Sequence, residues 1–214
     1  MTIAFKTLGM LAFPEADALQ KAYALARRND EIGDTVLFLE HPPVYTFGKQ
    51  SVETDFVKDA LWREMQGIDL CRADRGGRMT YHGPGQLIGY LIFKLSGWRR
   101  NVPVFVAAIE AALVETLAYF KIAAHPDPDN PGVWVNRDGR LAKIAAIGLH
   151  ISRGITRHGF ALNVFPNLAH YTGIVACGLH DGGVTSMQEI LGDPPVLLSE
   201  VSEVLKQNLT RRLT

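Results

Sequence analysis

Cys177 and Lys143 are the residues whose types best fit a nucleophile and its acid–base partner. Cys177 is followed by Gly178 in a turn-rich stretch, where a side chain is easily reached, although cysteines are most often small core residues. A thiol needs a nearby cation or a helix N-terminus to form the thiolate, because its free pKa is about 8.5. Lys143 precedes five uncharged residues ending at Gly148, which predicts a partly buried strand where an ammonium group needs a partner. The alternative is a lysine that extends its amine into water, as single lysines usually do.

The other cysteine and the histidines indicate neither a disulfide framework nor a metal centre. Cys71 lies in a predicted strand between Leu70 and Arg72 and fits a core cysteine. Two cysteines are too few for a disulfide scaffold and are consistent with a reducing compartment. Cys177 and His180 supply only half of a zinc ligand set, so no metal is expected. A cysteine–histidine hydrolase stays open, because catalytic partners need only meet in space.

A glycine-dense loop from Arg75 to Gln86 is the second feature that suggests chemistry. Its four glycines and one proline cost conformational entropy that a plain connection between two strands does not require. Glycine lets a ligand approach the backbone, whose N–H groups can then bind carbonyl or anionic oxygens. The loop lacks both phosphate-binding patterns, GxxxxGK[ST] and GxGxxG. Its polar residues favour a binding loop over a simple glycine-rich turn; they are Arg75, Thr80, Tyr81, His82 and Gln86.

Composition and charge argue against several classes of protein. The chain has 22 lysines and arginines against 22 aspartates and glutamates, so it lacks the basic excess of a nucleic-acid-binding protein. Hydrophobic residues make up 47% of the sequence, enough for a sizeable core. The most apolar stretch, Val102 to Ile122, contains Glu110 and Glu115, which favours a core helix over a membrane span. Without an export signal, the chain is expected to be cytoplasmic, with no membrane and no nucleic acid as partner.

Alternating helix and strand signals predict an α+β (α/β) fold with a mixed sheet. Hydrophobic residues at helical spacing predict helices over residues 14–29, 55–66, 104–122 and 199–213. Runs of β-branched and aromatic residues predict strands over 35–40, 68–73, 87–95, 133–135, 141–150 and 155–164. Asp138 and Gly139 are typical of a tight turn, so the strands on either side of them should form a hairpin.

Together these segments resemble the octanoyl-[acyl-carrier-protein]–protein N-octanoyltransferase family, also called lipoate-protein ligase B. The matching runs follow one another along most of the chain, which makes them far more specific than one glycine loop. Ala176 departs from the pattern, because a proline commonly precedes the cysteine in this family. The matching runs are 41–48 (HPPVYTxG), the loop 75–86, Lys143 to Gly148, 153–164 (RGITxHGFALNV), Cys177 with Gly178, and 184–186 (VTS).

The resemblance implies a fold and a reaction. The fold is that of the lipoate and biotin ligase catalytic domain, a central mixed β-sheet flanked by helices, formed here by a single domain of residues 1–214. The reaction is an acyl transfer from octanoyl-acyl carrier protein to the ε-amine of one lysine. The expected acceptors are the lipoyl domains of 2-oxoacid dehydrogenase complexes and the glycine-cleavage H protein. No cofactor and no metal are implied, and the enzyme is expected to be a monomer.

The resemblance also assigns roles to individual residues. Cys177 would carry the octanoyl group as a thioester, and Lys143 would be its catalytic partner. Backbone amides near Gly76, Gly77 and the turn at Cys177 are candidates for holding the oxyanion of the tetrahedral intermediate. The substrate-binding residues that line the acyl site would be Arg75, Gly76, Gly77, Arg78, Met79, Thr80, Tyr81, His82, Ala146, Ile147, Gly148, Gly159, Phe160 and Ala161.

Two other functions stay open. An ATP-dependent lipoate or biotin ligase of the same fold would activate a free acid as an acyl-adenylate and would not need Cys177. A requirement for ATP, with activity that survives Cys177→Ser, would favour that ligase. A non-catalytic protein that only binds acyl carrier protein or lipoyl domains would explain the glycine loop, but it would leave Cys177 and Lys143 without a role.

Overall fold

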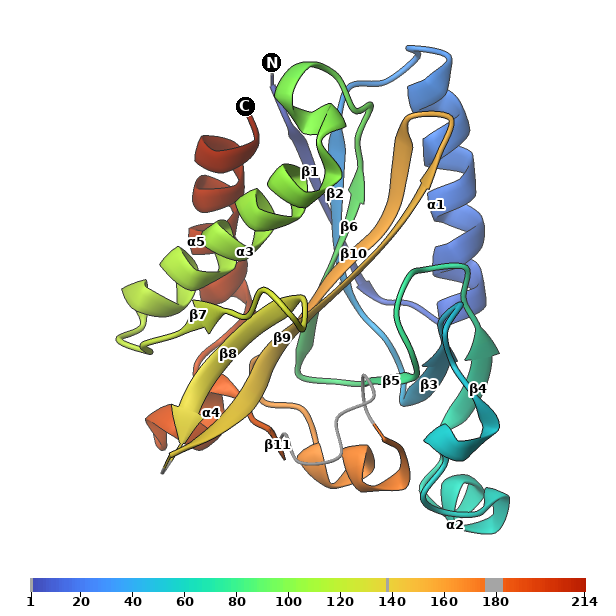
Figure 1. The fold of residues 1–214 in the computed structure, drawn as a ribbon, viewed down its shortest axis with the longest axis vertical. Helices are drawn as coiled ribbons and strands as arrows, with labels where there is room; N and C mark the ends of the chain where they lie inside the picture. Colours follow the sequence, from blue (N-terminus) through green and yellow to red (C-terminus); the bar gives the residue numbers. More distant parts are fainter. Residues whose placement is uncertain (1, 138, 176–182) are drawn as a thin grey trace.

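A mixed β-sheet of eight strands lies at the centre of the described chain (Figure 1). The computed structural model describes residues 2–137, 139–175 and 183–214. Across the sheet the strands are β1 (Ala4–Met10), β2 (Thr35–Glu40), β6 (Gln86–Ile92), β10 (Ile155–Asn163), β9 (Arg140–Ser152), β8 (Gly132–Arg137) and β7 (His125–Pro126), with β11 (Gly183–Val184) paired to β9. β1 is parallel to β2 and β11 is parallel to β9, whereas the other neighbours are antiparallel. The predicted central mixed sheet is confirmed.

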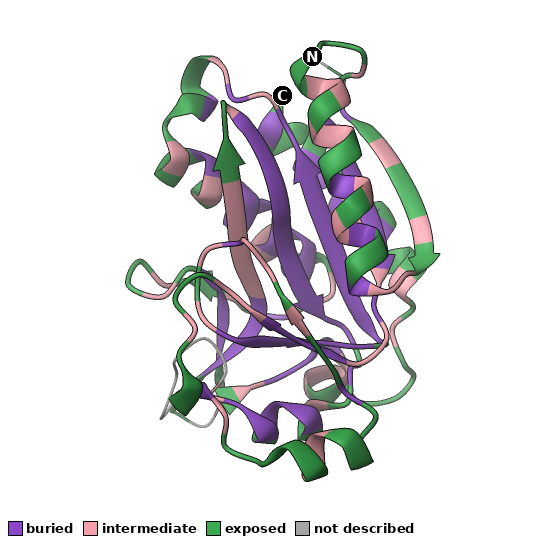
Figure 2. Cartoon of the chain, turned by 90° about the vertical axis from the view of Figure 1, so that its right-hand side faces the viewer, coloured by how far each residue is buried: buried purple, intermediate pink, exposed green. Residues whose placement is uncertain are grey.

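Helices cover both faces of this sheet. α1 (Phe13–Arg28) lies on one face, and α3 (Val102–Tyr119) and α5 (Leu198–Leu213) lie on the other (Figure 1). Side chains alternate between the faces along each strand. In β2, Val36 therefore packs in the cluster formed with α3 and α5, whereas Leu37 packs in the cluster formed with α1. Figure 2 shows that the middle strands of the sheet are buried along most of their length.

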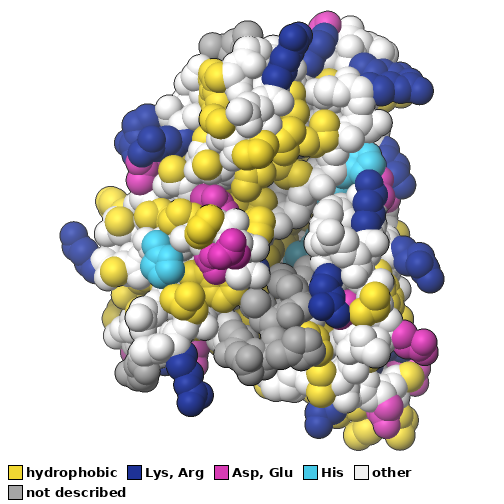
Figure 3. Space-filling view, viewed as in Figure 1, with side chains coloured by type: hydrophobic (Ala, Val, Ile, Leu, Met, Phe, Trp, Pro, Cys, Tyr) yellow, Lys and Arg dark blue, Asp and Glu magenta, His cyan; other side chains and the backbone are white. Residues whose placement is uncertain are grey.

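α3 is the main core helix, as the sequence predicts. Phe105, Ile109 and Leu113 recur every four residues, and each is fully buried against the sheet. Its outer side carries exposed apolar residues as well, including Val104 and Tyr119, and hydrophobic side chains gather in this part of the surface (Figure 3). By length and composition α3 would also suit a membrane span, as core helices can. The cytoplasmic location stays a prediction.

A smaller sheet of three strands stands beside the central one. β3 (Val44–Phe47) is parallel to β4 (Asp69–Arg72) and antiparallel to β5 (Thr80–His82). Its core includes Tyr45 and Tyr81, whose rings meet edge to face with their centroids 6.0 Å apart. Because the first part of the glycine loop, residues 75–79, lies between β4 and β5, this small sheet fixes both ends of that part.

The helix expected over residues 55–66 is shorter than predicted. Only α2 (Ala60–Met65) is α-helical within that range. Asp59 caps its start by accepting a hydrogen bond of 2.8 Å from a first-turn amide. The amide of Val57 instead donates to the carbonyl of Gly173, which holds the chain before Asp59 outside the helix.

Five strands of the described chain are absent from the sequence prediction: β1, β3, β5 and the two-residue strands β7 and β11. β5 lies inside the stretch from Arg75 to Gly85 that was expected to be a loop. β1 is an edge strand with five exposed residues out of seven, so it does not require the apolar alternation that identifies a half-buried strand. β3 directly follows Pro42 and Pro43, and prolines are typical of the end of a strand and not of its interior. The hairpin of β8 and β9 is confirmed, although Asp138 of its turn lies outside the described residues.

Gly89→Ala is expected to lower the free energy of unfolding by about 1–3 kcal/mol, because a methyl group there overpacks the core. A Cβ atom on Gly89 would come within 2.1 Å of the Phe160 ring. Gly33→Ala is the matched control, since its Cβ would meet only the Thr2 carbonyl oxygen, at 3.9 Å. Urea denaturation of both variants tests this, and equal stabilities would contradict it.

Candidate active site

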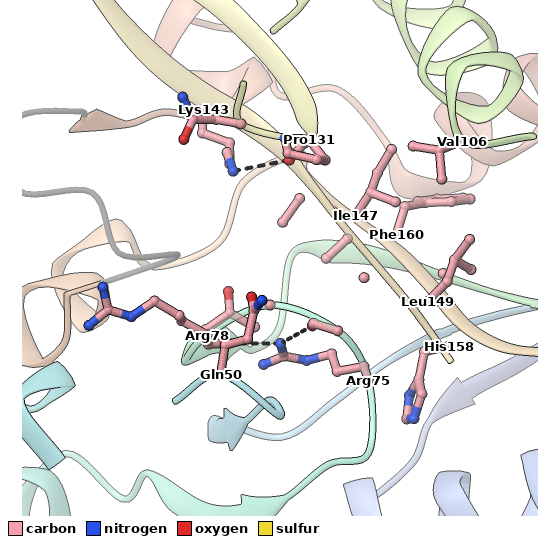
Figure 4. Close-up of a pocket in the computed structure, with 18 of the residues that line it drawn as sticks. Gln50, Arg75, Arg78, Val106, Pro131, Lys143, Ile147, Leu149, His158 and Phe160 are labelled. Atoms are coloured by element: carbon pink, nitrogen blue, oxygen red, sulfur yellow. Dashed lines mark hydrogen bonds between the residues drawn. The ribbon is translucent and has the colours of Figure 1, made fainter. Parts of the chain in front are cut away.

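A cavity of about 430 Å³ is lined on one side by the paired strands β9 and β10 and on the other by the first residues of the glycine loop. Ile147, Leu149 and Phe160 form an apolar side, which Val106 of α3 completes (Figure 4). Lys143 lies towards the other end, together with arginine and amide side chains from the facing loops. An apolar chain that ends in a polar reacting group fits a cavity of this two-sided character.

The structure brings together most of the residues that the sequence analysis assigned to the site. The residues that line the cavity are Arg75, Gly76, Gly77, Arg78, Thr80, His82, Lys143, Ala146, Ile147, Gly148, Gly159, Phe160 and Ala161.

Met79 and Tyr81 do not line the cavity, which corrects their predicted placement. Met79 is fully buried in the core of the small sheet, and the Tyr81 hydroxyl bonds to His170 Nδ1 at 2.8 Å. Thr80 and His82 line the cavity while Tyr81 between them does not, because successive side chains of a strand point to opposite faces. The sequence does not reveal this strand, so the alternation was not predicted.

Gly148 allows the loop to close over strand β9, because it has no side chain. A Cβ atom on Gly148 would meet the Gly76 carbonyl oxygen at 3.2 Å and Arg75 Cδ at 3.3 Å, which is tighter than ordinary contact. The Gly76 amide donates to the Leu149 carbonyl at 3.0 Å. This amide is therefore engaged in the fold, which counts against its predicted part in an oxyanion site, while that of Gly77 stays a prediction.

Arg75 ties the glycine loop together. Its guanidinium group donates to the carbonyl and to the hydroxyl of Thr46, each at 2.7 Å, and to the Arg78 carbonyl at 2.8 Å. Arg78 in turn forms an ion pair with the fully buried carboxylate of Asp55. These contacts show the two arginines holding the shape of the loop that frames the cavity.

Lys143 is buried, with 6% of its surface exposed. Its Nζ donates to the Pro131 carbonyl at 3.2 Å (Figure 4) and lies 4.6 Å from the centre of the Trp134 ring, on the neighbouring strand. No carboxylate of the described residues forms an ion pair with it. A buried ammonium group held by a carbonyl and a ring has its charge only partly compensated, so it can favour an anion formed nearby.

A bulge in β9 accounts for the placement of Lys143. Val133 of β8 pairs with Ala145, but the next residue, Trp134, pairs with Lys143, so Ile144 has no residue opposite. Such a bulge changes the direction of the side chains next to it.

Cys177, the predicted nucleophile, lies outside the described residues. The chain on both sides of it is well anchored. Before it, the Val175 amide donates to the Asp55 carbonyl at 2.7 Å. After it, Val184 pairs in register with Lys143, and the Thr185 amide donates to the Lys143 carbonyl at 3.0 Å.

Several lining residues are missing from the sequence analysis. Val106 had been assigned only to a core helix, and helical periodicity does not show which residue faces a cavity. His158 stands inside one of the runs that carry the family resemblance, next to the predicted Gly159, and that adjacency is the signal that could have found it. The other additions are Phe13, Gln50, Tyr90, Asp129, Asn130, Pro131 and Leu149.

A model of the lipoyl protein ligase A/B catalytic domain family matches residues 14–210 of this sequence. The chain belongs to this family. Among its relatives, an octanoyltransferase of Myxococcus xanthus is 42% identical to this chain over 206 residues. These residues cover 95% of this chain and 57% of the relative. An octanoyltransferase of Alkaliphilus metalliredigens is 44% identical over 188 residues, which cover 87% of this chain and 84% of the relative. The chain thus spans little more than half of the first relative and most of the second.

The solved structures show the same fold at low sequence identity. A bipartite lipoate protein ligase from Thermoplasma acidophilum, described with its E2 lipoyl domain, is 17% identical and superposes with a TM-score of 0.76. The match covers 100% of this chain and 84% of that one. The expected lipoate-ligase fold is therefore confirmed.

Three buried histidines lie at the cavity: His82 and His158 line it, and His41 lies behind them. His41 bonds through Nδ1 to the Leu11 carbonyl at 2.6 Å and through Nε2 to the Tyr90 hydroxyl at 2.7 Å. A carbonyl only accepts hydrogen bonds, so Nδ1 carries the proton and neutral Nε2 accepts from Tyr90. Burial lowers the pKa of His41 to about 4, and burial also lowers the pKa of His82 and His158. The histidines are therefore neutral near pH 7.

The free energy of unfolding is expected to fall as the pH drops from 6.5 to about 4, because in this range the unfolded chain binds protons that folded His41 resists. The contribution of His41 is roughly 3 kcal/mol, present above pH 6.5 and lost towards pH 4. His41→Asn should flatten the pH dependence, while His125→Asn, at an exposed position, should leave it unchanged. Denaturant titrations from pH 4 to 8 test this, and parallel curves for wild type and His41→Asn would refute it.

Proposed function

We propose that this chain is an octanoyltransferase of protein lipoylation, which transfers octanoyl from octanoyl-acyl carrier protein to lysines of lipoyl domains through a thioester on Cys177. The relatives at 42% and 44% identity are octanoyltransferases, in agreement with the acyltransferase expected from the sequence. The observation that carries the proposal is the position of Lys143, a buried amine at the end of an apolar cavity. The proposed acceptors are the lipoyl domains of 2-oxoacid dehydrogenase complexes and the glycine-cleavage H protein, and the proposed enzyme is a monomer.

The cavity suits a medium-length acyl chain. Seven apolar carbons of octanoyl would contribute between about 5 and 6 kcal/mol on leaving water, at about 0.8 kcal/mol per carbon. Ile147, Leu149 and Phe160 supply the apolar side, and the paired glycines Gly148 and Gly159 add no side chain to the cavity wall. Such a site would reject acetyl strongly and would separate neighbouring chain lengths only weakly.

A cysteine suits a thioester donor. Attack of the Cys177 thiolate on octanoyl-acyl carrier protein forms a new thioester and releases the carrier thiolate, which takes up a proton. Exchange of one thioester for another conserves the activated acyl group, so no ATP is needed. Attack by the amine of the acceptor lysine then forms an amide and returns the thiol, and the stability of the amide drives this second half-reaction.

Lys143 would act in both half-reactions. As a cation, it favours the thiolate of Cys177. Lys143 then donates a proton to the departing carrier thiolate, which leaves it a neutral amine. In the second half-reaction this amine can accept a proton from the incoming lysine amine.

The ATP-dependent ligase is the alternative. The similarity to the archaeal ligase concerns the fold alone, at 17% identity, whereas the relatives at 42% and 44% identity are octanoyltransferases. A protein that only binds its partners would not require the buried Lys143 beside an acyl-sized cavity.

Incubation with octanoyl-acyl carrier protein should add one octanoyl group to Cys177. Intact-mass measurement with peptide mapping detects the adduct, which should be absent from Cys177→Ala. Cys71→Ala is the control and should still acquire the label, because burial raises the pKa of the Cys71 thiol and disfavours its thiolate. A label on Cys71 would overturn the assignment, and label formation only with ATP and a free acid would favour the ligase.

Lys143→Ala should slow formation of the octanoyl-enzyme by at least about 100-fold, because a general acid–base group contributes roughly 10²–10⁴ to a rate. Rapid-quench mass spectrometry measures the acylation rate. Lys121→Ala, at an exposed lysine, is the control and should acylate at the wild-type rate. A wild-type rate in a folded Lys143→Ala protein would remove Lys143 from the mechanism.

Val106→Phe should shift the preference towards shorter acyl chains, because the larger side chain occupies the apolar end of the cavity. Each excluded methylene should cost about fourfold in kcat/KM relative to wild type, the equivalent of about 0.8 kcal/mol. Val104→Phe, at an exposed position on the same helix, is the matched control. Competition among carrier proteins loaded with hexanoyl, octanoyl and decanoyl measures the preference, and an unchanged profile would exclude Val106 from the acyl site.

A further inference from the structure

Glu110 of α3 is a buried carboxyl group to which the proposed mechanism gives no role. Only 9% of its surface is exposed, and its Oε1 accepts a hydrogen bond of 2.9 Å from the Gly132 amide. It forms no ion pair within the described part of the chain. Burying a carboxylate with one amide partner is costly, and an apolar residue would pack in this helix without that cost. We therefore expect Glu110 to have a role that an apolar residue at this position could not fill.

The residue that donates to Glu110 is adjacent in sequence to the residue that holds Lys143. The residue before Gly132 is Pro131, whose carbonyl accepts the hydrogen bond from Lys143 Nζ at 3.2 Å. Two hydrogen bonds thus follow one another: the Gly132 amide donates to Glu110, and Lys143 Nζ donates to the carbonyl of the preceding residue, Pro131. A shift of the backbone at residues 131–132 would move the acceptor that holds the ammonium group.

Only glycine fits the backbone at position 132. Gly132 has φ +133°, and a Cβ atom there would lie 2.5 Å from the Ala145 carbonyl oxygen and 3.4 Å from Lys143 Cε. A glycine at this point lets Pro131 approach Lys143, but it gives the backbone little stiffness of its own. The Glu110 side chain supplies a fixed partner for the Gly132 amide.

The turn before Pro131, residues 127–130, is held from within. Asp127 accepts hydrogen bonds of 3.0 Å from the Asp129 amide and from the Asn130 side chain. Trp134 Nε1 donates to the Asn130 carbonyl at 3.0 Å, and the same ring lies beneath Lys143 Nζ. Glu110 fixes the other end of this turn to α3. Val106, which lines the acyl cavity, lies one helical turn before Glu110 on the same side of that helix.

We infer that Glu110 is a positioning residue for Lys143: its hydrogen bond to the Gly132 amide fixes the Pro131 carbonyl that holds the lysine ammonium group at the end of the acyl cavity. The inference deepens the proposed function and rests on it for the effect on catalysis. α3 thereby connects the two ends of the site, with Val106 at the acyl chain and Glu110 behind the lysine.

The electrostatic surroundings agree with this arrangement. Burial raises the pKa of Glu110, while the Gly132 amide and the charge of Lys143 act to lower it. The charge of Lys143 from β9 acts on Glu110 and also on Asp127 of the turn, and Asp129 and Arg78 line the same cavity as Lys143. Removal of the charge of Glu110 alone leaves the hydrogen-bond geometry in place, so glutamine separates the two effects.

Glu110→Ala and Glu110→Gln form the test, with steady-state octanoyl transfer as the first readout. Glu110→Ala should lower kcat by roughly 10- to 100-fold with KM for the octanoyl carrier within about twofold of wild type, since misplacement of a reacting group costs rate and not substrate binding. Glu110→Gln keeps an oxygen acceptor for the Gly132 amide and should retain kcat within about threefold of wild type. Equal losses in both variants would show that Glu110 acts through its charge and would overturn the inference, as would wild-type kcat in Glu110→Ala.

Glu115→Ala is the matched control on the same helix. Glu115 pairs at the surface with Arg211 and Arg212 of α5, so its loss should leave kcat unchanged. Thermal unfolding of all three variants identifies any that fail to fold.

Chemical labelling of Lys143 tests the positioning role without any assumption about the reaction. The variants are treated with acetic anhydride between pH 6 and 9, and the labelling of Lys143 is compared by peptide mass spectrometry with that of exposed Lys121. In Glu110→Ala the labelling of Lys143 should rise several-fold, because Nζ loses its fixed acceptor, whereas Glu110→Gln should stay closer to wild type. Unchanged labelling in Glu110→Ala would overturn the inference. A wild-type protein that transfers no octanoyl would refute the proposed function alone, and the labelling result would still decide the role of Glu110.

Discussion

The site depends on one constraint, the burial of the Lys143 ammonium group without a carboxylate partner among the described residues. Water would stabilise this charge far better than one carbonyl and one aromatic ring do. The bulge at Ile144 and the glycine at position 132 nevertheless place the ammonium group beside the cavity. A cation whose charge is only partly compensated favours the formation of an anion nearby, and a thiolate forms most readily in such an environment.

The cavity follows from close packing between the glycine loop and β9. Gly148 has no side chain to separate the two backbones, and Arg75 holds the loop through its hydrogen bonds to Thr46. The loop is thus a wall built from backbone and the buried guanidinium group of Arg75, with the partly exposed Arg78 beside it. The histidines on and behind this wall are neutral near pH 7, so an apolar chain would meet no additional charge from them. A wall that is already held in place loses little conformational entropy of its own when a ligand binds.

Membership of the family indicates which reaction this geometry serves. The same fold occurs in the archaeal lipoate protein ligase, so the fold does not distinguish ligase from transferase. The similarity to octanoyltransferases at 42% and 44% identity makes that distinction, and the proposed thioester on Cys177 explains how a transferase would work without ATP. Helix α3 adds a second level of organisation, because Val106 contacts the acyl cavity and Glu110 contacts the segment that holds Lys143.

The sequence by itself determined the core helix α3, the positions of the main strands along the chain and the mixed character of the sheet. Its ordered motifs determined the family. These features depend on local periodicity and residue type, which can be read along the chain. Tertiary structure alone decided that Thr80 and His82 face the cavity while Tyr81 faces the core, because the parity of a strand is fixed by its pairing. It also decided that Glu110 meets Gly132, 22 positions away, because the partner of a buried side chain depends on how distant elements pack.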